Sequence, residues 1–194
     1  MKNILIINGN PKENSLSKYL ATELKKSFSP FHSCRLTNIR ELEFNPDLSD
    51  GYDEPKCLED DLIEFRQHII WAEHLVILTP VWWGGMPAKL KGLFDRVFLP
   101  GFAFTFSNDS IEQTKLLVNK TASLVLTMDS PLALYESLNS PLSTQLKSSI
   151  LEFSGIQVTS ENVISPTFGL SPKLLEITLE TVTKDIERVI KEPL

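Results

Sequence analysis

The sequence predicts a doubly wound α/β fold, in which a five-stranded parallel sheet in the order 2-1-3-4-5 carries helices on both faces. Strand-like apolar runs alternate with helix-like segments five times, and this alternation is typical of right-handed crossovers between parallel strands. The run Leu75-Val76-Ile77-Leu78 is continuously apolar, as expected for a strand covered on both faces. Because 194 residues supply one sizeable core, we expect a single domain over residues 1–194.

Strands and helices alternate from the start of the chain. An Ile-rich run over residues 2–7 ends at the turn-forming Asn8-Gly9-Asn10-Pro11, and leucines then recur every four residues from Leu16, as on a helix with one buried side. Residues 34–39 suggest the second strand. The stretch of residues 40–56 is rich in Pro and acidic residues, and it is too interrupted for either element. We interpret this excursion as a functional segment or a surface loop.

The middle of the chain continues the alternation. Apolar residues from Leu58 to Ile69 recur at spacings of four, three and four, which predicts a helix that ends near Trp71. Residues 74–79 supply the third strand. This strand contains the continuously apolar run, so we expect it to lie at the centre of the sheet.

The next helix begins near Pro87 and runs to about Phe98, since proline is favoured in a first helical turn. An aromatic loop over residues 101–106 and a fourth strand at residues 121–127 follow.

The last third of the chain completes the sheet. Residues 142–153 predict a helix that stops at Ser154-Gly155, because glycine commonly ends a helix. Residues 156–164 hold the fifth strand. The final helix follows Ser171-Pro172, with apolar residues at spacings of four and three.

Composition excludes several classes of function. The formal net charge of −6 leaves no broad basic surface for nucleic acid or for acidic membranes. The apolar runs are far shorter than the roughly 20 residues needed to insert into a membrane, so we expect a cytoplasmic protein. Two cysteines without a CxxC motif and three histidines without paired spacing predict neither a disulfide nor a metal site.

Common phosphate-binding and catalytic motifs are missing. The sequence contains neither GxGxxG after the first strand, nor a P-loop, nor a GxSxG elbow. A phospho-receiver would need acidic residues after the first strand, where Asn8 and Asn10 stand.

In such a sheet, ligands bind at the carboxyl ends of the strands. The first loop there places the hydroxyls of Ser15 and Ser17 and backbone N–H groups at a helix start, where a phosphate is favoured. The alternative is that Ser15 only caps the helix.

The loop after the third strand contains Trp82 and Trp83, followed by Gly84 and Gly85. Indole walls and glycines that let backbone N–H groups approach closely are suited to a flat aromatic ligand. Because neighbours on an extended segment point in opposite directions, we expect one tryptophan to pack in the core and the other to face the ligand.

Four segments carry a specific resemblance. They read Pro80-Val81-Trp82-Trp83, Met86-Pro87-Ala88-Lys89-Leu90-Lys91-Gly92, Phe94-Asp95-Arg96-Val97-Phe98 and Gly101-Phe102-Ala103-Phe104. This pattern resembles that of the NAD(P)H:quinone oxidoreductase family of flavodoxin-like flavoproteins. The resemblance implies a flavodoxin-like fold and a tightly bound flavin, FMN or FAD.

The resemblance also implies which residues bind the flavin. They are Asn10, Ser15, Leu16, Ser17, Pro80, Val81, Trp82, Trp83, Gly84, Thr127, Met128 and Asp129. Backbone N–H groups near Gly84 and at Met128 to Asp129 would face the ring. Two positions depart from the family: Asn10 stands where histidine is common, and the Met128-Asp129-Ser130 stretch replaces a glycine-containing loop. We expect Asp129 to point outward or to cap the following turn, and the larger residues to narrow the substrate cleft.

Three further residues have two open interpretations each. Tyr135 aligns with a tyrosine that relays charge together with a histidine, but no histidine follows His74; Tyr135 is therefore either catalytic or a wall or core residue. Phe104 and Phe106 align with aromatic residues that reach the neighbouring subunit's active site in a homodimer, where they could contact substrate by stacking. Their alternative role is dimer or core packing.

The expected function is transfer of hydride from NAD(P)H through the flavin to a quinone or similar small electron acceptor, by a ping-pong mechanism in which the cofactor performs the chemistry. One alternative is a regulatory flavoprotein that senses redox state or nucleotide for a partner such as a transporter, with residues 40–56 as its interaction surface. A third possibility is a flavodoxin-like electron carrier.

Overall fold

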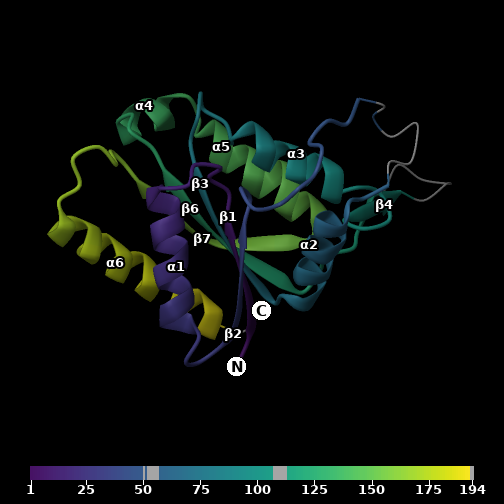
Figure 1. Cartoon of the computed structure of the whole chain (residues 1–194), viewed down its shortest axis with the longest axis horizontal. Helices are drawn as coiled ribbons and strands as arrows, with labels where there is room; N and C mark the ends of the chain where they lie inside the picture. The colour runs from purple at the N-terminus through teal and green to yellow at the C-terminus, as the bar shows by residue number, and fades with distance from the viewer. Residues whose placement is uncertain (50, 52–56, 107–112, 193–194) are drawn as a thin grey trace.

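The computed structural model of the chain describes residues 1–49, 51, 57–106 and 113–192. Its central sheet has five parallel strands, in the spatial order β2-β1-β3-β6-β7 (Figure 1). They are β2 (Ser33–Asn38), β1 (Asn3–Asn8), β3 (His74–Pro80), β6 (Lys120–Thr127) and β7 (Ile156–Ile164). Numbered among themselves, these strands have the order 2-1-3-4-5, so the predicted topology is confirmed.

The alternation of side chains along the strands divides the core into two layers. In β1, Ile4 and Ile6 pack toward one face of the sheet, and Leu5 and Ile7 pack toward the other. Every residue of β3 is buried, which agrees with the continuously apolar run predicted for a central strand.

Helices cover both faces of the sheet (Figure 1). One face carries α1 (Leu16–Phe28) and α6 (Pro172–Lys191), whose leucines, valines and isoleucines form one core cluster with the sheet. The other face carries α2 (Asp60–Trp71), α3 (Ala88–Val97) and the helical stretch of α5 (Pro141–Thr144) and η1 (Gln145–Glu152). The α3 and η1 helices lie side by side on this second face.

Three features differ from the sequence prediction. The expected aromatic loop contains β4 (Phe104–Phe106), which pairs with β5 (Gln113–Lys115) in a small antiparallel sheet. A short helix, α4 (Leu132–Ser137), follows β6 without having been predicted. The helix predicted over residues 142–153 is mostly the π-helix η1, with α-helical residues only at its two ends. Helix α4 is only six residues long, too short to give the repeated apolar spacing on which helix prediction relies.

The described part of the excursion after β2 forms neither a helix nor a strand, as predicted. It is fixed by the fully buried Arg96 of α3, whose guanidinium donates to the carbonyls of Asn45 and Cys57 and pairs with the carboxylate of Glu59. Residues 50 and 52–56 lie outside the described part. Among the described residues, no helix is long and apolar enough to span a bilayer.

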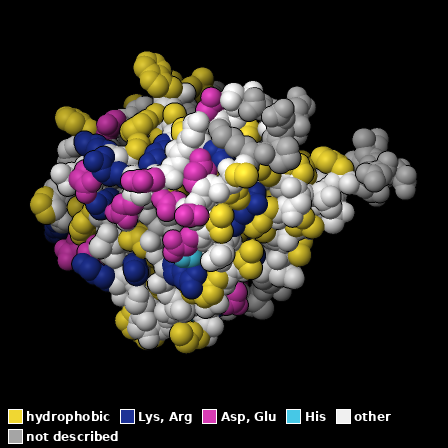
Figure 2. All heavy atoms as spheres, turned by 45° about the vertical axis from the view of Figure 1, so that its right-hand side comes forward, with side chains coloured by type: hydrophobic (Ala, Val, Ile, Leu, Met, Phe, Trp, Pro, Cys, Tyr) yellow, Lys and Arg dark blue, Asp and Glu magenta, His cyan; other side chains and the backbone are white. Residues whose placement is uncertain are grey.

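Charged side chains cover much of the surface. Figure 2 shows acidic and basic side chains interleaved on one face of the molecule, while apolar side chains protrude at its edges. The exposed apolar residues include Trp82, Trp83 and Phe106, all of which the sequence places in candidate binding loops.

Candidate functional site

Three loops meet at the carboxyl edge of the sheet. The N–H of Val81, after β3, donates to the carbonyl of Thr127 at 2.8 Å. The hydroxyls of Thr127 and Ser17 lie 3.4 Å apart, which joins the end of β6 to the start of α1. Residues predicted from three separate stretches of sequence are therefore brought together at one edge.

The loop after β1 is shaped by asparagine side chains. The Oδ1 atom of Asn8 accepts from the N–H of Asn10 at 3.2 Å, and Oδ1 of Asn10 accepts from the N–H of Lys12 at 3.0 Å. The Nδ2 atom of Asn8 donates to Oδ1 of Asn38, at the end of the neighbouring strand, at 3.1 Å. Such side-chain to backbone bonds hold a loop in a defined turn, so Asn10 is a buried structural part of this loop.

The start of α1 has the properties of an anion site. Ser15 is the N-cap and accepts from the N–H of Lys18 at 3.2 Å. The N–H groups of Ser15, Leu16 and Ser17 donate to no acceptor in the described part of the chain, and the first turn carries no acidic residue. Unpaired N–H groups at a helix start attract anions through the helix dipole. Ser15 thus caps the helix and leaves the neighbouring donors available.

The two tryptophans sit on a tight turn. Trp82 and Gly85 exchange both backbone hydrogen bonds, at 2.8 and 2.9 Å. The two residues between them have positive φ angles, 52° at Trp83 and 76° at Gly84, which is the pattern of a type I′ turn. Glycine suits this conformation, whereas a tryptophan in it is strained.

Neither tryptophan packs in the core, so the prediction that one of them does is wrong. Trp82 is 45% exposed and Trp83 is fully exposed. The prediction assumed an extended segment, but the reversal of the chain places both indoles outside. Pro80 and Val81 instead pack at the end of β3, where Pro80 is buried and Val81 is half-buried.

The loop after β6 differs from the expectation for Met128. The N–H of Met128 donates to the carbonyl of Ile164 at 3.1 Å, and its carbonyl accepts from the N–H of Thr167 at 2.9 Å. This N–H is therefore not available to a ligand. Asp129 is exposed and its carboxylate accepts from the Thr167 hydroxyl, so its side chain points outward and does not cap α4.

Tyr135 lies in the core, with 3% of its surface exposed. Its phenolic oxygen accepts from the N–H of Ser143 at 2.8 Å and lies 3.1 Å from the Ser143 hydroxyl. The Ser143 hydroxyl in turn donates to Oε1 of Glu161 at 2.5 Å. Because that donation uses the Ser143 proton, the Tyr135 proton points to Ser143. The tyrosine thus provides an N-terminal cap for the α5 helix, which lacks a side-chain cap of its own.

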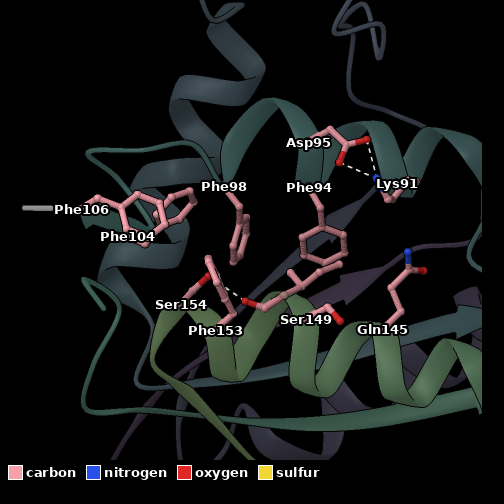
Figure 3. Close-up of a pocket in the computed structure, with 11 residues that line it drawn as sticks. Lys91, Phe94, Asp95, Phe98, Phe104, Phe106, Gln145, Ser149, Phe153 and Ser154 are labelled. Carbon is pink, nitrogen blue, oxygen red and sulfur yellow. Dashed lines mark hydrogen bonds and ion pairs between the residues drawn. The ribbon is translucent and has the colours of Figure 1, made fainter. Parts of the chain in front are cut away.

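Phe104 and Phe106 line a groove between α3 and η1, shown in Figure 3. The groove has a volume of about 410 Å³. Its lining residues are Lys91, Phe94, Asp95, Phe98, Phe104, Phe106, Gln145, Ser149, Ile150, Phe153 and Ser154. The ring of Phe104 contacts those of Phe153 and Phe106 edge-on, with centroids 5.1 and 5.5 Å apart. Neither tryptophan lines this groove, so the structure separates the predicted substrate residues from the predicted flavin residues within one chain.

Sequence reasoning missed Phe94, Phe98 and Phe153 as members of this groove. Phe94 and Phe98 are four residues apart on or beside α3, with ring centroids 5.1 Å apart. That spacing is a recognisable signal for a shared helix face. The contribution of Phe153 comes from a distant segment and had no local signal.

The residues at the carboxyl edge fit a phosphorylated planar cofactor. The unpaired N–H groups at the start of α1 suit a phosphate, whereas the Ser17 side chain is fully buried and its hydroxyl lies beside that of Thr127. The N–H groups of Trp83 and Gly84 also have no acceptor within the described residues, and they lie beside two exposed indole faces. Polar donors next to aromatic surface suit a flat heterocycle.

The chain is similar in sequence to a family with a flavodoxin-like fold and to NAD(P)H oxidoreductases. The model of a family described as having a flavodoxin-like fold matches residues 2–183. An uncharacterised NAD(P)H oxidoreductase of Haemophilus influenzae is 31% identical over 139 residues, which are 68% of this chain and 65% of that protein. NAD(P)H dehydrogenase (quinone) 1 of Rattus norvegicus is 28% identical over 139 residues, 70% of this chain and 50% of that protein. The matched region thus spans about half to two thirds of these relatives.

Solved structures share the fold. NAD(P)H:quinone oxidoreductase from Methanothermobacter marburgensis has a TM-score of 0.76 at 20% identity, covering 94% of this chain and 96% of that one. An FMN-dependent NADH-azoreductase from Bacillus anthracis, in complex with FMN, has a TM-score of 0.69 at 18% identity, covering 97% and 99%.

Proposed function

This chain belongs to the flavodoxin-like fold family, and on that premise we propose that it is a flavin-dependent oxidoreductase that passes hydride from NAD(P)H to a quinone or similar small acceptor. The names of the similar proteins, NAD(P)H oxidoreductases and a quinone dehydrogenase, support this reaction. The observation that carries the proposal is the meeting of Ser17, Val81 and Thr127 at one edge, beside unpaired N–H groups and exposed indoles.

We propose FMN as the flavin. Its phosphate matches the unpaired donors at the start of α1, and the similar azoreductase structure contains FMN. The bound flavin would supply a ring that takes up and gives back hydride. In the proposal, Ser15, Leu16 and Ser17 hold the phosphate, and the loop from Pro80 to Gly84 holds the ring.

In this proposal the residues of the chain bind and orient the flavin. The N–H groups of Trp83 and Gly84 would donate to polar atoms of the ring, and the indoles would shield it from water. In the loop after β6, the N–H of Met128 is bonded to Ile164, whereas that of Asp129 has no acceptor among the described residues and would be a further donor. Tyr135 has a structural role in this proposal, because its hydroxyl is hydrogen-bonded to Ser143.

We further propose that the active form is a homodimer and that donor and acceptor use one cleft in turn, in a ping-pong mechanism. Phe104 and Phe106 lie in a groove apart from the tryptophans, and Phe106 is 54% exposed. A second copy seated on this apolar groove would cover it and would bring Phe106 toward the tryptophans of that copy. The interface between the two copies would then include part of the substrate cleft.

The test is the visible absorption spectrum of the purified full-length protein. We expect a flavin band that bleaches when NADH or NADPH is added without oxygen and that returns when a quinone is added. Chromatography of the released cofactor identifies it as FMN or FAD. A colourless protein that takes up neither flavin would overturn the proposal. A flavin band that NAD(P)H leaves unchanged would retain flavin binding and exclude the reductase reaction.

A further inference from the structure

The segment that follows β2 joins two parts of the candidate site that are far apart in sequence. Residues 39–46 leave the sheet where the N–H of Ile39 donates to the carbonyl of Asn8 at 2.9 Å. From there the chain passes α3, as the dark-blue trace beyond β2 shows in Figure 1. From the sequence, residues 40–56 are expected to be a functional segment or a surface loop, or the interaction surface of a regulatory flavoprotein. The proposed function gives residues 39–46 no role.

The segment is fixed along the first turns of α3. The ammonium group of Lys89 donates to the carbonyl of Leu42 at 2.6 Å and to that of Arg40 at 3.2 Å. Gly92, one turn later, faces Pro46 so closely that a Cβ atom there would lie 2.3 Å from Cβ of Pro46. The missing side chain lets the segment lie against the helix.

A buried ion pair continues the same attachment. Arg96 lies one further turn along α3 and is fully buried. Its guanidinium donates to the carbonyl of Asn45 and binds the carboxylate of Glu59. Lys89, Gly92 and Arg96 are spaced by three and four, so they share one face of α3. This face holds the segment in place.

The start of the segment also reaches the loop after β1, through the side chain of Arg40. The guanidinium of Arg40 donates from Nη1 to the carbonyl of Pro11 at 3.2 Å, and its Nε lies 2.6 Å from Oε2 of Glu13. Oε1 of Glu13 is also 2.6 Å from the ammonium group of Lys18, in the first turn of α1. Arg40 therefore contacts the loop from outside, immediately before the unpaired N–H groups at Ser15 to Ser17.

We propose that residues 39–46 form a brace that links the loop of residues 10–15 to α3, and that Arg40 is its positioning residue for phosphate binding. The inference rests on the proposed function, because it assigns the phosphate to the start of α1. Arg40 would not touch the phosphate. It would fix the backbone of Pro11 and Glu13, so that the donors that follow are already oriented when the phosphate arrives.

The exposure of the Arg40–Glu13 ion pair indicates whether loss of the brace should affect folding stability or phosphate affinity. The side chains of Arg40 and Glu13 are 53% and 54% exposed, and exposed ion pairs contribute little to folding stability. Preorganised donors, in contrast, raise affinity because the ordering cost is met before binding. Loss of the brace should therefore weaken phosphate binding and leave the thermal unfolding of the flavin-free chain nearly unchanged.

The experiment measures flavin affinity of the full chain with Arg40→Met, by quenching of flavin fluorescence. Two probes are used: FMN, and riboflavin, which has the same ring and no phosphate. We expect FMN to bind about tenfold more weakly and riboflavin to bind as it does to the wild type. Arg188→Met is the matched control, because Arg188 is an exposed arginine with two acidic partners on α6; it should change neither affinity.

Lys89→Met tests the attachment of the brace to α3. Alone, this substitution should also weaken FMN binding and leave riboflavin binding unchanged. Combined with Arg40→Met, it should weaken FMN binding little further, because both substitutions release the same segment. Unchanged FMN affinity in Arg40→Met, or equal weakening of both flavins, would overturn the brace. Fully additive effects of the two substitutions would also overturn it. If the wild type itself binds FMN no better than riboflavin, the phosphate site of the proposed function fails instead.

Discussion

Trp83 shows how a single residue can be placed against its backbone preference. Its φ angle of 52° lies in the left-handed region, and its side chain is fully exposed. A strained residue that gains no burial in return points to a role in binding. The adjacent Gly84, with φ of 76°, completes the turn at no such cost.

We predict that Trp83→Gly does not lower the free energy of unfolding, because the side chain has no packing to lose and glycine relieves a strain of about 1–3 kcal/mol. The same change should raise KM for a quinone several-fold, since one indole wall is removed. Thermal unfolding and steady-state kinetics measure the two effects. A lower melting temperature with unchanged KM would show that the indole serves stability.

His74 is a buried polar residue inside the sheet. Its ring nitrogens lie 2.7 Å from the Thr121 hydroxyl and 3.0 Å from the Ser123 hydroxyl. Burial, assisted by the positive charges of Lys2 and His32, lowers the pKa of His74 from 6.5 to about 3. The folded protein thus keeps this imidazole neutral under conditions in which the unfolded chain protonates it.

The lowered pKa predicts a loss of stability in acid. Below about pH 6.5 the His74 imidazole is protonated in the unfolded chain but stays neutral in the folded chain. The free energy of unfolding therefore falls as pH decreases toward 3. This group contributes at most about 1.4 kcal/mol per pH unit to that fall. Urea unfolding at pH 7 and pH 5 should show this decline. In His74→Asn, which is less stable at pH 7, the decline should be shallower; an identical pH dependence would assign the effect to other groups.

At the scale of elements, α4, α5 and β7 are joined by the chain of hydrogen bonds from Tyr135 through Ser143 to Glu161. A six-residue helix such as α4 is not stable by itself. The buried phenol ties it to the start of α5, and the Glu161 carboxylate ties α5 to the edge of the sheet. This arrangement explains a buried tyrosine without assigning it to catalysis.

The substitution Tyr135→Phe distinguishes a structural role of Tyr135 from a catalytic one. We expect it to cost about 1–3 kcal/mol of folding stability, because the buried N–H of Ser143 loses its acceptor. The rate of flavin reduction by NADPH, followed without oxygen in a stopped-flow instrument, should change less than twofold. A fall of about a hundredfold, the scale of a lost general acid, would restore the catalytic interpretation.

At the scale of the molecule, the groove between α3 and η1 leaves apolar surface uncovered. Phenylalanines from β4, α3 and the end of η1 converge on it (Figure 3). Exposed apolar patches of this kind mark interaction surfaces, which supports the proposed homodimer.

We therefore predict that Phe106→Glu yields a monomer by light scattering and loses quinone reduction, while flavin stays bound. Tyr19→Glu is the matched control, because Tyr19 is a comparably exposed aromatic residue on α1, which covers the opposite face of the sheet. It should remain a dimer. A wild-type monomer with full activity would exclude a site shared between two copies.

The sequence predicted the main elements because their signals are local. Apolar runs and helical spacings located all five strands of the main sheet to within one residue at most boundaries, and the strand order followed from crossover rules. Short elements had no such signal. The three-residue strands β4 and β5 form a small sheet of their own, and they are too short to show an alternating pattern.

By itself, then, the sequence determined the doubly wound sheet, the loops that carry the candidate site, and the serine and tryptophan motifs within them. Only the tertiary structure decided that both tryptophans are exposed, that the Met128 N–H is occupied, and that Arg40 reaches from one loop to another. Helix and strand formation depends on neighbours in sequence, whereas the direction of a side chain or an N–H group depends on contacts between distant segments. Those contacts, among them the bonds of Lys89 to the carbonyls of Arg40 and Leu42, exist only once the chain has folded.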